Sequence, residues 1–225
     1  MSTEVKICGL SSEESVDAAL AAGADFVGFV LFPPSPRNVA LERAATLAHR
    51  ARGKAQIVAL TVDGDDALLA AIAETLRPDL LQLHGNEAPE RVKFIRGTTG
   101  VPVMKVIGVA AKGDLAAISG YTTDRLLLDA KPPRDATRPG GHGVAFDWEV
   151  LENFASPRPW FLSGGLDPKN VVEALTATQA PGVDVSSGVE SAPGRKDPAR
   201  IRAFIEAVRD YDRARAGAAG KERAA

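Results

Sequence analysis

Eight short apolar runs recur along the chain, and each ends near Gly, Asp or Ser. They cover residues 5–8, 26–32, 56–62, 80–84, 101–109, 125–130, 160–163 and 183–186. Their starting points lie 21 to 35 residues apart, which is enough for one strand and one crossover helix. We therefore predict eight β-strands separated by helical segments.

The segments between these runs favour helices. Ala- and Leu-rich stretches occupy residues 15–22, 41–52, 67–76, 171–178 and 199–215. In the last of them Ile201, Phe204, Ile205 and Val208 follow the i, i+3, i+4, i+7 spacing of an amphipathic helix. Strands that alternate with helices indicate a parallel sheet.

Eight such units closing on themselves form a (β/α)8 TIM barrel, and 225 residues lie within the size range of that fold. An open doubly wound sheet is the alternative, but no Gly-rich dinucleotide fingerprint follows the first strand. We predict one α/β domain, a (β/α)8 TIM barrel over residues 1–216, and a disordered tail over residues 217–225.

Composition and charge narrow the class of partner. Hydrophobic residues make up 45% and charged residues 25%, which excludes a wholly disordered chain, a collagen or a disulfide scaffold. Lys and Arg number 27 against 29 Asp and Glu, so we expect neither a nucleic-acid nor a membrane partner. A single cysteine and the lack of a recognisable signal peptide or apolar span predict a cytoplasmic protein.

Active sites of TIM barrels lie at the carboxyl ends of the strands, so polar residues there are candidates. Gln82 and His84 share one face of their predicted strand, and Asp184 and Ser186 share one face of theirs. We expect both pairs to point into the mouth of the barrel.

Two Gly-containing loops follow the seventh and eighth runs, where this fold often binds phosphate. Gly164 and Gly165 precede Asp167-Pro168, which is a favourable start for a helix, and Ser186, Ser187 and Gly188 form the second loop. Backbone N–H groups at glycine and at a helix start favour an anion. Two ordinary turns are the alternative, and we predict a phosphate site.

Three further residues could carry chemistry. Cys8 ends the first run and is either a buried apolar residue or a base or nucleophile, with Lys6 as a candidate for the positive charge that a thiolate needs. Asp129 ends an apolar strand and is either a structural group, in an ion pair or a helix cap, or a general acid. Arg37 lies in a Pro-rich loop suited to holding a guanidinium against a carboxylate or phosphate; a surface arginine is the alternative.

The long segment 131–143 is rich in Pro, Gly and charge, and we interpret it as a βα loop that could serve as a lid. Three scattered histidines without metal-binding spacing make a metal site improbable. We expect no metal and no organic cofactor.

Together these motifs resemble one family, the phosphoribosylanthranilate isomerases of tryptophan biosynthesis. The matching pieces are Lys6-Ile7-Cys8-Gly9-Leu10, Gly23 to Phe29, Ser35-Pro36-Arg37, Leu81-Gln82-Leu83-His84-Gly85, Leu128-Asp129-Ala130, Gly143 to Trp148, Leu162 to Leu166, and Val183 to Glu190. One position departs from the family pattern, because His142 stands where the family usually has Thr between two glycines.

The resemblance implies an Amadori rearrangement of N-(5′-phosphoribosyl)anthranilate to 1-(2-carboxyphenylamino)-1-deoxyribulose 5-phosphate. Asp129 matches the general acid that opens the furanose ring, and Cys8 matches the general base that removes the C2′ proton. Arg37 matches the residue that holds the anthranilate carboxylate, with Gln82, His84 and Asp184 as further substrate-binding candidates. The two Gly-containing loops would hold the phosphate.

Two other functions are compatible with the phosphate loops. Another phosphosugar enzyme on this barrel, such as an indole-3-glycerol-phosphate synthase or a histidine-pathway aldose–ketose isomerase, would use carboxylates or lysine instead of Cys8. A phosphosugar-binding protein would not need Cys8 and Asp129 together. We predict a small phosphosugar as substrate and a monomer or homodimer.

Overall fold

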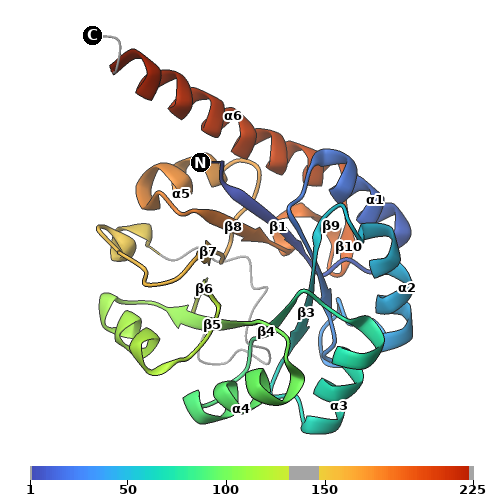
Figure 1. The fold of residues 1–225 in the computed structure, drawn as a ribbon. Helices are drawn as coiled ribbons and strands as arrows, with labels where there is room; N and C mark the ends of the chain where they lie inside the picture. Colours follow the sequence, from blue (N-terminus) through green and yellow to red (C-terminus); the bar gives the residue numbers. More distant parts are fainter. Residues whose placement is uncertain (1, 132–146, 223–225) are drawn as a thin grey trace.

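The computed structural model describes residues 2–131 and 147–222, and its central feature is a closed barrel of eight parallel strands (Figure 1). The strands pair in chain order, and β1 closes the barrel against β8. The structure therefore confirms the predicted (β/α)8 fold. The strands are β1 Glu4–Cys8, β2 Phe26–Val30, β3 Gln56–Thr61, β4 Leu80–Leu83, β5 Val103–Val109, β6 Arg125–Ala130, β7 Trp160–Leu162 and β8 Gly182–Val185.

Helices surround the barrel, although their type varies around the ring. The segment predicted as one helix over residues 67–76 is an α-helix followed by a π-helical turn, and short 3₁₀ segments follow β5 and precede β7. The helical elements are α1 Glu13–Ala22, α2 Leu41–Ala51, α3 Asp66–Ala71, η1 Ile72–Leu76, α4 Pro89–Thr99, η2 Lys112–Gly120, η3 Trp148–Leu151, α5 Val171–Thr178, η4 Ser187–Val189 and α6 Pro198–Glu222.

Apolar side chains from six strands of the barrel form one buried cluster. They are Phe26, Val58, Leu80, Met104, Val106, Leu127 and Phe161. Phe26 and Phe161 pack edge to face with ring centroids 5.1 Å apart. Gly182 makes room for this pair, because a Cβ there would lie 2.7 Å from the Phe161 ring. The polar residues at the carboxyl ends of the strands are therefore supported by a packed apolar cluster.

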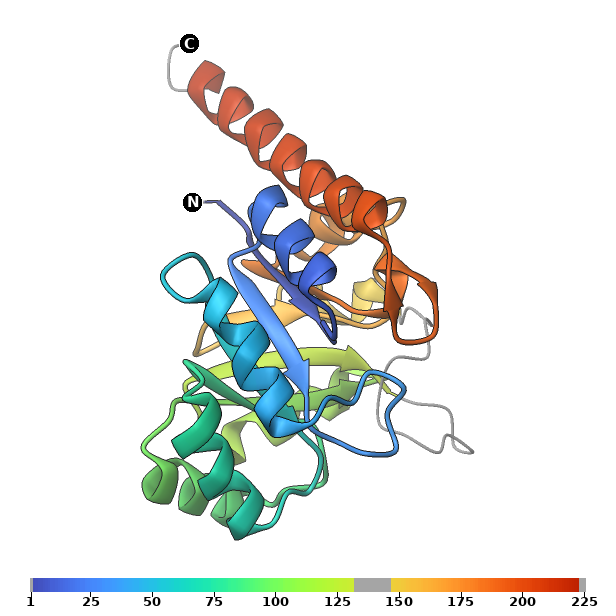
Figure 2. The same ribbon diagram turned by 90° about the vertical axis from the view of Figure 1, so that its right-hand side faces the viewer.

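A small hairpin interrupts the path from β8 to the last helix. It consists of β9 Glu190–Ala192 and β10 Arg195–Lys196, and Gly194 lies at its turn. Figure 2 shows this hairpin, in orange, on the same side of the molecule as the blue loop between β2 and α2. Gly194 touches that loop, since a Cβ there would lie 2.3 Å from the Pro36 carbonyl oxygen.

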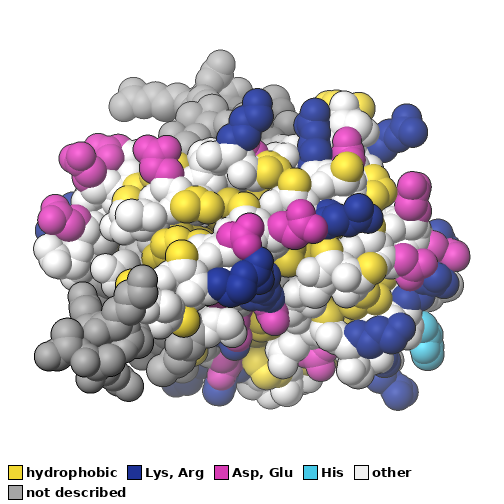
Figure 3. Space-filling view, turned by 90° about the horizontal axis from the view of Figure 1, so that it is seen from above, with side chains coloured by type: hydrophobic (Ala, Val, Ile, Leu, Met, Phe, Trp, Pro, Cys, Tyr) yellow, Lys and Arg dark blue, Asp and Glu magenta, His cyan; other side chains and the backbone are white. Residues whose placement is uncertain are grey.

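Helix α6 continues to Glu222 and so includes the first residues of the tail predicted to begin at residue 217. Its last turns project beyond the barrel (Figure 2). Acidic and basic side chains are interspersed on the face seen in Figure 3, in keeping with a formal net charge of −2. Among the described residues, no helix combines the length and apolar character that a membrane crossing requires.

Candidate active site

Cys8 lies at the carboxyl end of β1 and is 4% exposed. Lys6, two residues earlier, is fully buried, and its Nζ donates to Asp184 Oδ1 at 2.8 Å. Gly28 on β2 leaves the space these groups occupy, because a Cβ there would lie 3.2 Å from Lys6 Nζ and 3.3 Å from Cys8 Sγ. The structure thus brings together Cys8, the predicted cation Lys6 and the predicted site residue Asp184.

The charges around Cys8 act in opposite directions on its proton. Burial raises the pKa of the Cys8 thiol, whereas the neighbouring positive charges of Lys6 and Lys196 partly oppose that rise. Burial lowers the pKa of Lys6, but Asp184 and Cys8 together more than compensate, so the pKa of Lys6 is raised and the side chain is an ammonium ion. A thiolate at Cys8 would therefore have a fixed counter-ion beside it.

Arg37 is buried and bound to a carboxylate of the protein itself. Its Nε donates to Glu190 Oε1 at 2.7 Å and its Nη2 donates to Glu190 Oε2 at 2.9 Å. The stem of Arg37 crosses the turn after β1, where a Cβ on Gly9 would lie 2.7 Å from Arg37 Cδ. Gly9 has a φ of 77°, which favours glycine as well. Arg37 is thus a buried, ion-paired side chain and not the surface arginine that was the alternative.

Lys196, on β10, joins this group from the hairpin. Its Nζ donates to Glu190 Oε1 at 2.7 Å and to the Ser186 carbonyl oxygen at 2.9 Å. The Ser186 hydroxyl in turn donates to the Cys8 carbonyl oxygen at 3.1 Å. Sequence reasoning missed Glu190 and Lys196; the Pro193-Gly194 turn after the eighth strand was the signal that could have indicated a hairpin.

A second group of site residues forms around Asp129 on β6. Asp129 is 7% exposed, and His84 Nε2 lies 3.3 Å from its Oδ2. His84 Nδ1 lies 3.5 Å from Gln82 Nε2, while Gln82 Oε1 is buried without a hydrogen-bond partner among the described residues. Gln82 and His84, which were predicted to share one face of their strand, thus lie beside each other, and Asp129 lies with them.

The first Gly-containing loop packs against Asp129. A Cβ on Gly164 would lie 3.0 Å from Asp129 Oδ1 and 2.5 Å from the Ala130 nitrogen, so glycine is required there. Gly164 and Gly165 both have positive φ, and their N–H groups donate to no described residue. Two amides at the carboxyl ends of the strands are therefore available to an anion.

The second loop touches the first, as the prediction of a shared phosphate site requires. A Cβ on Gly188 would lie 1.9 Å from the Leu166 carbonyl oxygen. Ser187 begins the short turn η4 between Ser186 and Glu190. The helix predicted over residues 171–178 is confirmed as α5 Val171–Thr178. Asp167-Pro168 lies in the turn before this helix and does not begin it, and Asp167 Oδ1 accepts hydrogen bonds there from the backbone nitrogens of Lys169 and Asn170.

Substituting Gly188 with Ala is expected to destabilise the protein. The added methyl group would meet backbone atoms of Leu166, which cannot move aside as a flexible side chain would. Overpacking of this kind costs about 1–3 kcal/mol, which corresponds to a fall in Tm of about 2–12 °C in a protein of this size. Thermal unfolding followed by circular dichroism measures the change.

Gly97→Ala is the matched control for that substitution. Gly97 is exposed within α4, and no atom lies within 4 Å of a Cβ placed there. Alanine is the better helix former by about 0.5–1 kcal/mol, so the control is expected to keep or raise Tm. Equal Tm values for the two variants would contradict the tight contact between the loops.

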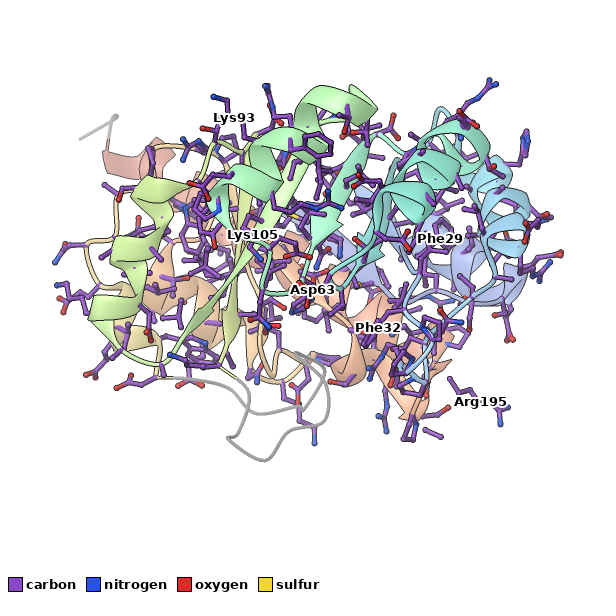
Figure 4. The ribbon with its side chains drawn as sticks, turned by 90° about the horizontal axis from the view of Figure 1, so that it is seen from below. Phe29, Phe32, Asp63, Lys93, Lys105 and Arg195 are labelled. Carbon is purple, nitrogen blue, oxygen red and sulfur yellow. The ribbon has the colours of Figure 1, made fainter. Side chains whose placement is uncertain are left out.

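A buried ion pair supports the loop that carries His84. Lys105 Nζ donates to Glu87 Oε2 at 2.8 Å and to the Gly85 carbonyl oxygen at 2.7 Å. Glu87 also accepts hydrogen bonds from the backbone nitrogens of Asp63 and Gly85. Asp63 and Lys105, both labelled in Figure 4, are therefore linked through Glu87. The pair holds the loop after β4 next to the loop after β3.

Two further expectations were the absence of a metal site and a lid over residues 131–143. Among residues 2–131 and 147–222, no group of three or more His, Cys, Asp or Glu side chains could hold a metal ion. The predicted lid over residues 131–143, with His142, lies outside the described residues apart from Lys131.

Comparison with known proteins identifies the family. A family model described as N-(5'phosphoribosyl)anthranilate (PRA) isomerase matches residues 5–207, which is most of the chain. The chain belongs to this family. It is therefore an enzyme, an isomerase of tryptophan biosynthesis on a TIM barrel, as its motifs predicted.

Individual N-(5′-phosphoribosyl)anthranilate isomerases are similar to this chain over nearly their whole length. The protein from Rhodopseudomonas palustris strain BisA53 is 58% identical over 215 residues, covering 95% of this chain and 99% of that protein. The crystal structure of the Thermotoga maritima enzyme has a TM-score of 0.83 and 33% identity, covering 92% of this chain and 99% of that one. A crystal structure of phosphoribosyl anthranilate isomerase in complex with reduced 1-(o-carboxyphenylamino)-1-deoxyribulose 5-phosphate has a TM-score of 0.78 and 30% identity, with the same coverage.

Proposed function

We propose that the chain converts N-(5′-phosphoribosyl)anthranilate to 1-(2-carboxyphenylamino)-1-deoxyribulose 5-phosphate by an Amadori rearrangement, with Asp129 as general acid and Cys8 as general base. The observation that carries the proposal is the separation of the site into two groups. Cys8 lies on β1 and Asp129 on β6, with β7 and β8 between them around the barrel. A sugar in the mouth can thus be approached from two sides.

In the first step Asp129 donates its proton to the ring oxygen, and the C1′–O4′ bond breaks to give a protonated Schiff base. The position of Asp129 suits this role, because it is largely withdrawn from water and lies beside the loop proposed to bind phosphate. His84 and Gln82, next to Asp129, are proposed to contact the ribose hydroxyl groups.

In the second step the Cys8 thiolate removes the C2′ proton, and the resulting enolamine tautomerises to the ketone. The Lys6 ammonium, held by Asp184, favours the thiolate. We assign the anthranilate carboxylate to Arg37, and the phosphate to the backbone of Gly164, Gly165, Ser186, Ser187 and Gly188. A related isomerase solved with the reduced product supports a ligand bearing both anionic groups.

The cytoplasmic location, the lack of a cofactor and the choice between monomer and homodimer stay predictions from the sequence.

The test is a fluorescence assay on freshly generated N-(5′-phosphoribosyl)anthranilate. Purified protein is expected to accelerate the loss of anthranilate fluorescence well beyond the spontaneous breakdown of the substrate, and chromatography should identify the carboxyphenylamino-deoxyribulose phosphate. If no enzyme-dependent loss occurs, or if the product is different, the proposed reaction is wrong.

A further inference from the structure

Glu190 lies between two buried cations and uses both of its carboxylate oxygens. It is 6% exposed. Oε1 accepts from Arg37 Nε and from Lys196 Nζ, each at 2.7 Å. Oε2 accepts from Arg37 Nη2 at 2.9 Å and from the Gly194 nitrogen at 3.2 Å. Four donors from two loops therefore converge on one side chain.

The way Arg37 is bound leaves a defined part of it unused. A guanidinium can bind one carboxylate along the edge formed by Nε and Nη2 and a second along the edge formed by Nη1 and Nη2. Glu190 occupies the first edge. The second edge makes no hydrogen bond to a described residue, and Gly9, against which the stem of Arg37 packs, is next to Cys8 in the chain. Arg37 is thus oriented by one carboxylate while able to bind another.

The surrounding charges also favour a further anion. The buried ionic side chains near Cys8 are three cations, Lys6, Arg37 and Lys196, and two anions, Asp184 and Glu190. Paired as they are, they leave one positive charge in excess while the Cys8 thiol is neutral, and the thiolate proposed for catalysis would balance that charge. A buried excess charge is costly unless an anion compensates it.

We propose that Glu190 is a positioning residue that sets the specificity of the site for an aryl carboxylate. It holds the guanidinium of Arg37 by one edge, so that the other edge faces the carboxylate of the substrate. This inference rests on the proposed function, in which Arg37 binds that carboxylate, and it adds a residue and a cause of selectivity.

The test compares two non-reacting ligands on the Glu190→Gln variant. One is reduced 1-(o-carboxyphenylamino)-1-deoxyribulose 5-phosphate, and the other is the same compound without the carboxylate. Because Gln presents one acceptor instead of two, Arg37 loses its fixed orientation. The affinity for the carboxylate ligand, measured by calorimetry, is expected to fall on the order of 10- to 100-fold. The affinity for the ligand without the carboxylate should change by less than about twofold, since it does not use that edge.

Glu206→Gln is the matched control, because Glu206 is exposed on α6 and belongs to no described ion pair. The double variant Glu190→Gln with Lys196→Met restores the net charge that these ion pairs have in the wild type and safeguards against misfolding of the single variant. If charge balance were the whole role of Glu190, the double variant would regain affinity for the carboxylate ligand; positioning predicts that it does not.

Four further results would overturn the inference. Equal weakening of both ligands, or loss of the fold in both Glu190 variants, would assign Glu190 a structural role. Unchanged affinity for the carboxylate ligand would show that Arg37 needs no such support. If the wild type binds both ligands alike, the assignment of the carboxylate to Arg37 fails as well, whereas the proposed isomerase reaction is judged separately by the fluorescence assay.

Discussion

Replacing Asp129 with Asn is expected to remove nearly all turnover and to leave ligand binding largely intact. The amide has the shape of a carboxylic acid but has no proton acidic enough to give to the ring oxygen. General acid catalysis contributes about 10²- to 10⁴-fold to a rate, so kcat should fall by about that factor. The measurement is the rate of fluorescence loss, together with the affinity for the reduced product.

The surroundings of Asp129 can accept Asn without a steric clash. The side chain lies between His84 Nε2, 3.3 Å from Oδ2, and the Gly164 backbone next to Oδ1, and an amide fills the same volume. Asp210→Asn, at an exposed position on α6, is the control for removing a carboxylate. If Asp129→Asn lost binding and turnover to the same extent, Asp129 would have a binding or folding role instead.

Most of the barrel could be predicted from hydrophobic patterning. Each predicted strand overlaps an observed one, and the differences lie at the ends. The fifth run was predicted from residue 101, yet β5 begins at Val103, since Pro102 has no N–H to donate to a neighbouring strand. The second run was predicted to residue 32, whereas β2 ends at Val30. The strands of a parallel barrel are buried on both faces, so they can be recognised in the sequence as nearly continuous apolar runs.

The supporting half of the site could not be predicted in the same way. Glu190 and Arg37 are 153 positions apart in the chain, and Lys6 and Asp184 are 178 apart. Periodicity reports which face of an element is buried, but it does not say which charged residue pairs with which across a closed barrel. The strand ends therefore indicated Cys8, Asp129 and Arg37, while Glu190 and Lys196 emerged only when the hairpin was placed against the β2–α2 loop.

Replacing Cys8 with either Ala or Ser is expected to abolish turnover by a similar factor, about 10²- to 10⁴-fold in kcat, because neither side chain gives a usable base. Ala removes the sulfur from a buried site, whereas Ser nearly keeps its size and hydrogen-bonding capacity. Similar losses in both variants would therefore reflect the missing thiolate and not a packing defect. Both variants should still bind the reduced product, and retained turnover in either would contradict the assignment of Cys8 as base.

The pH dependence of the wild type gives an independent test of the same group. Only the thiolate can accept the C2′ proton, so the limb of the kcat profile that depends on the base should rise with pH until the thiol is ionised, whereas loss of the Asp129 proton gives a separate, falling limb. Since burial raises the pKa of Cys8, this rise should extend above the ordinary range of a thiol. Removing the ammonium in Lys6→Met should move the rise to still higher pH, because Lys6 opposes the effect of burial. A profile that does not move in that variant would mean that another group removes the proton.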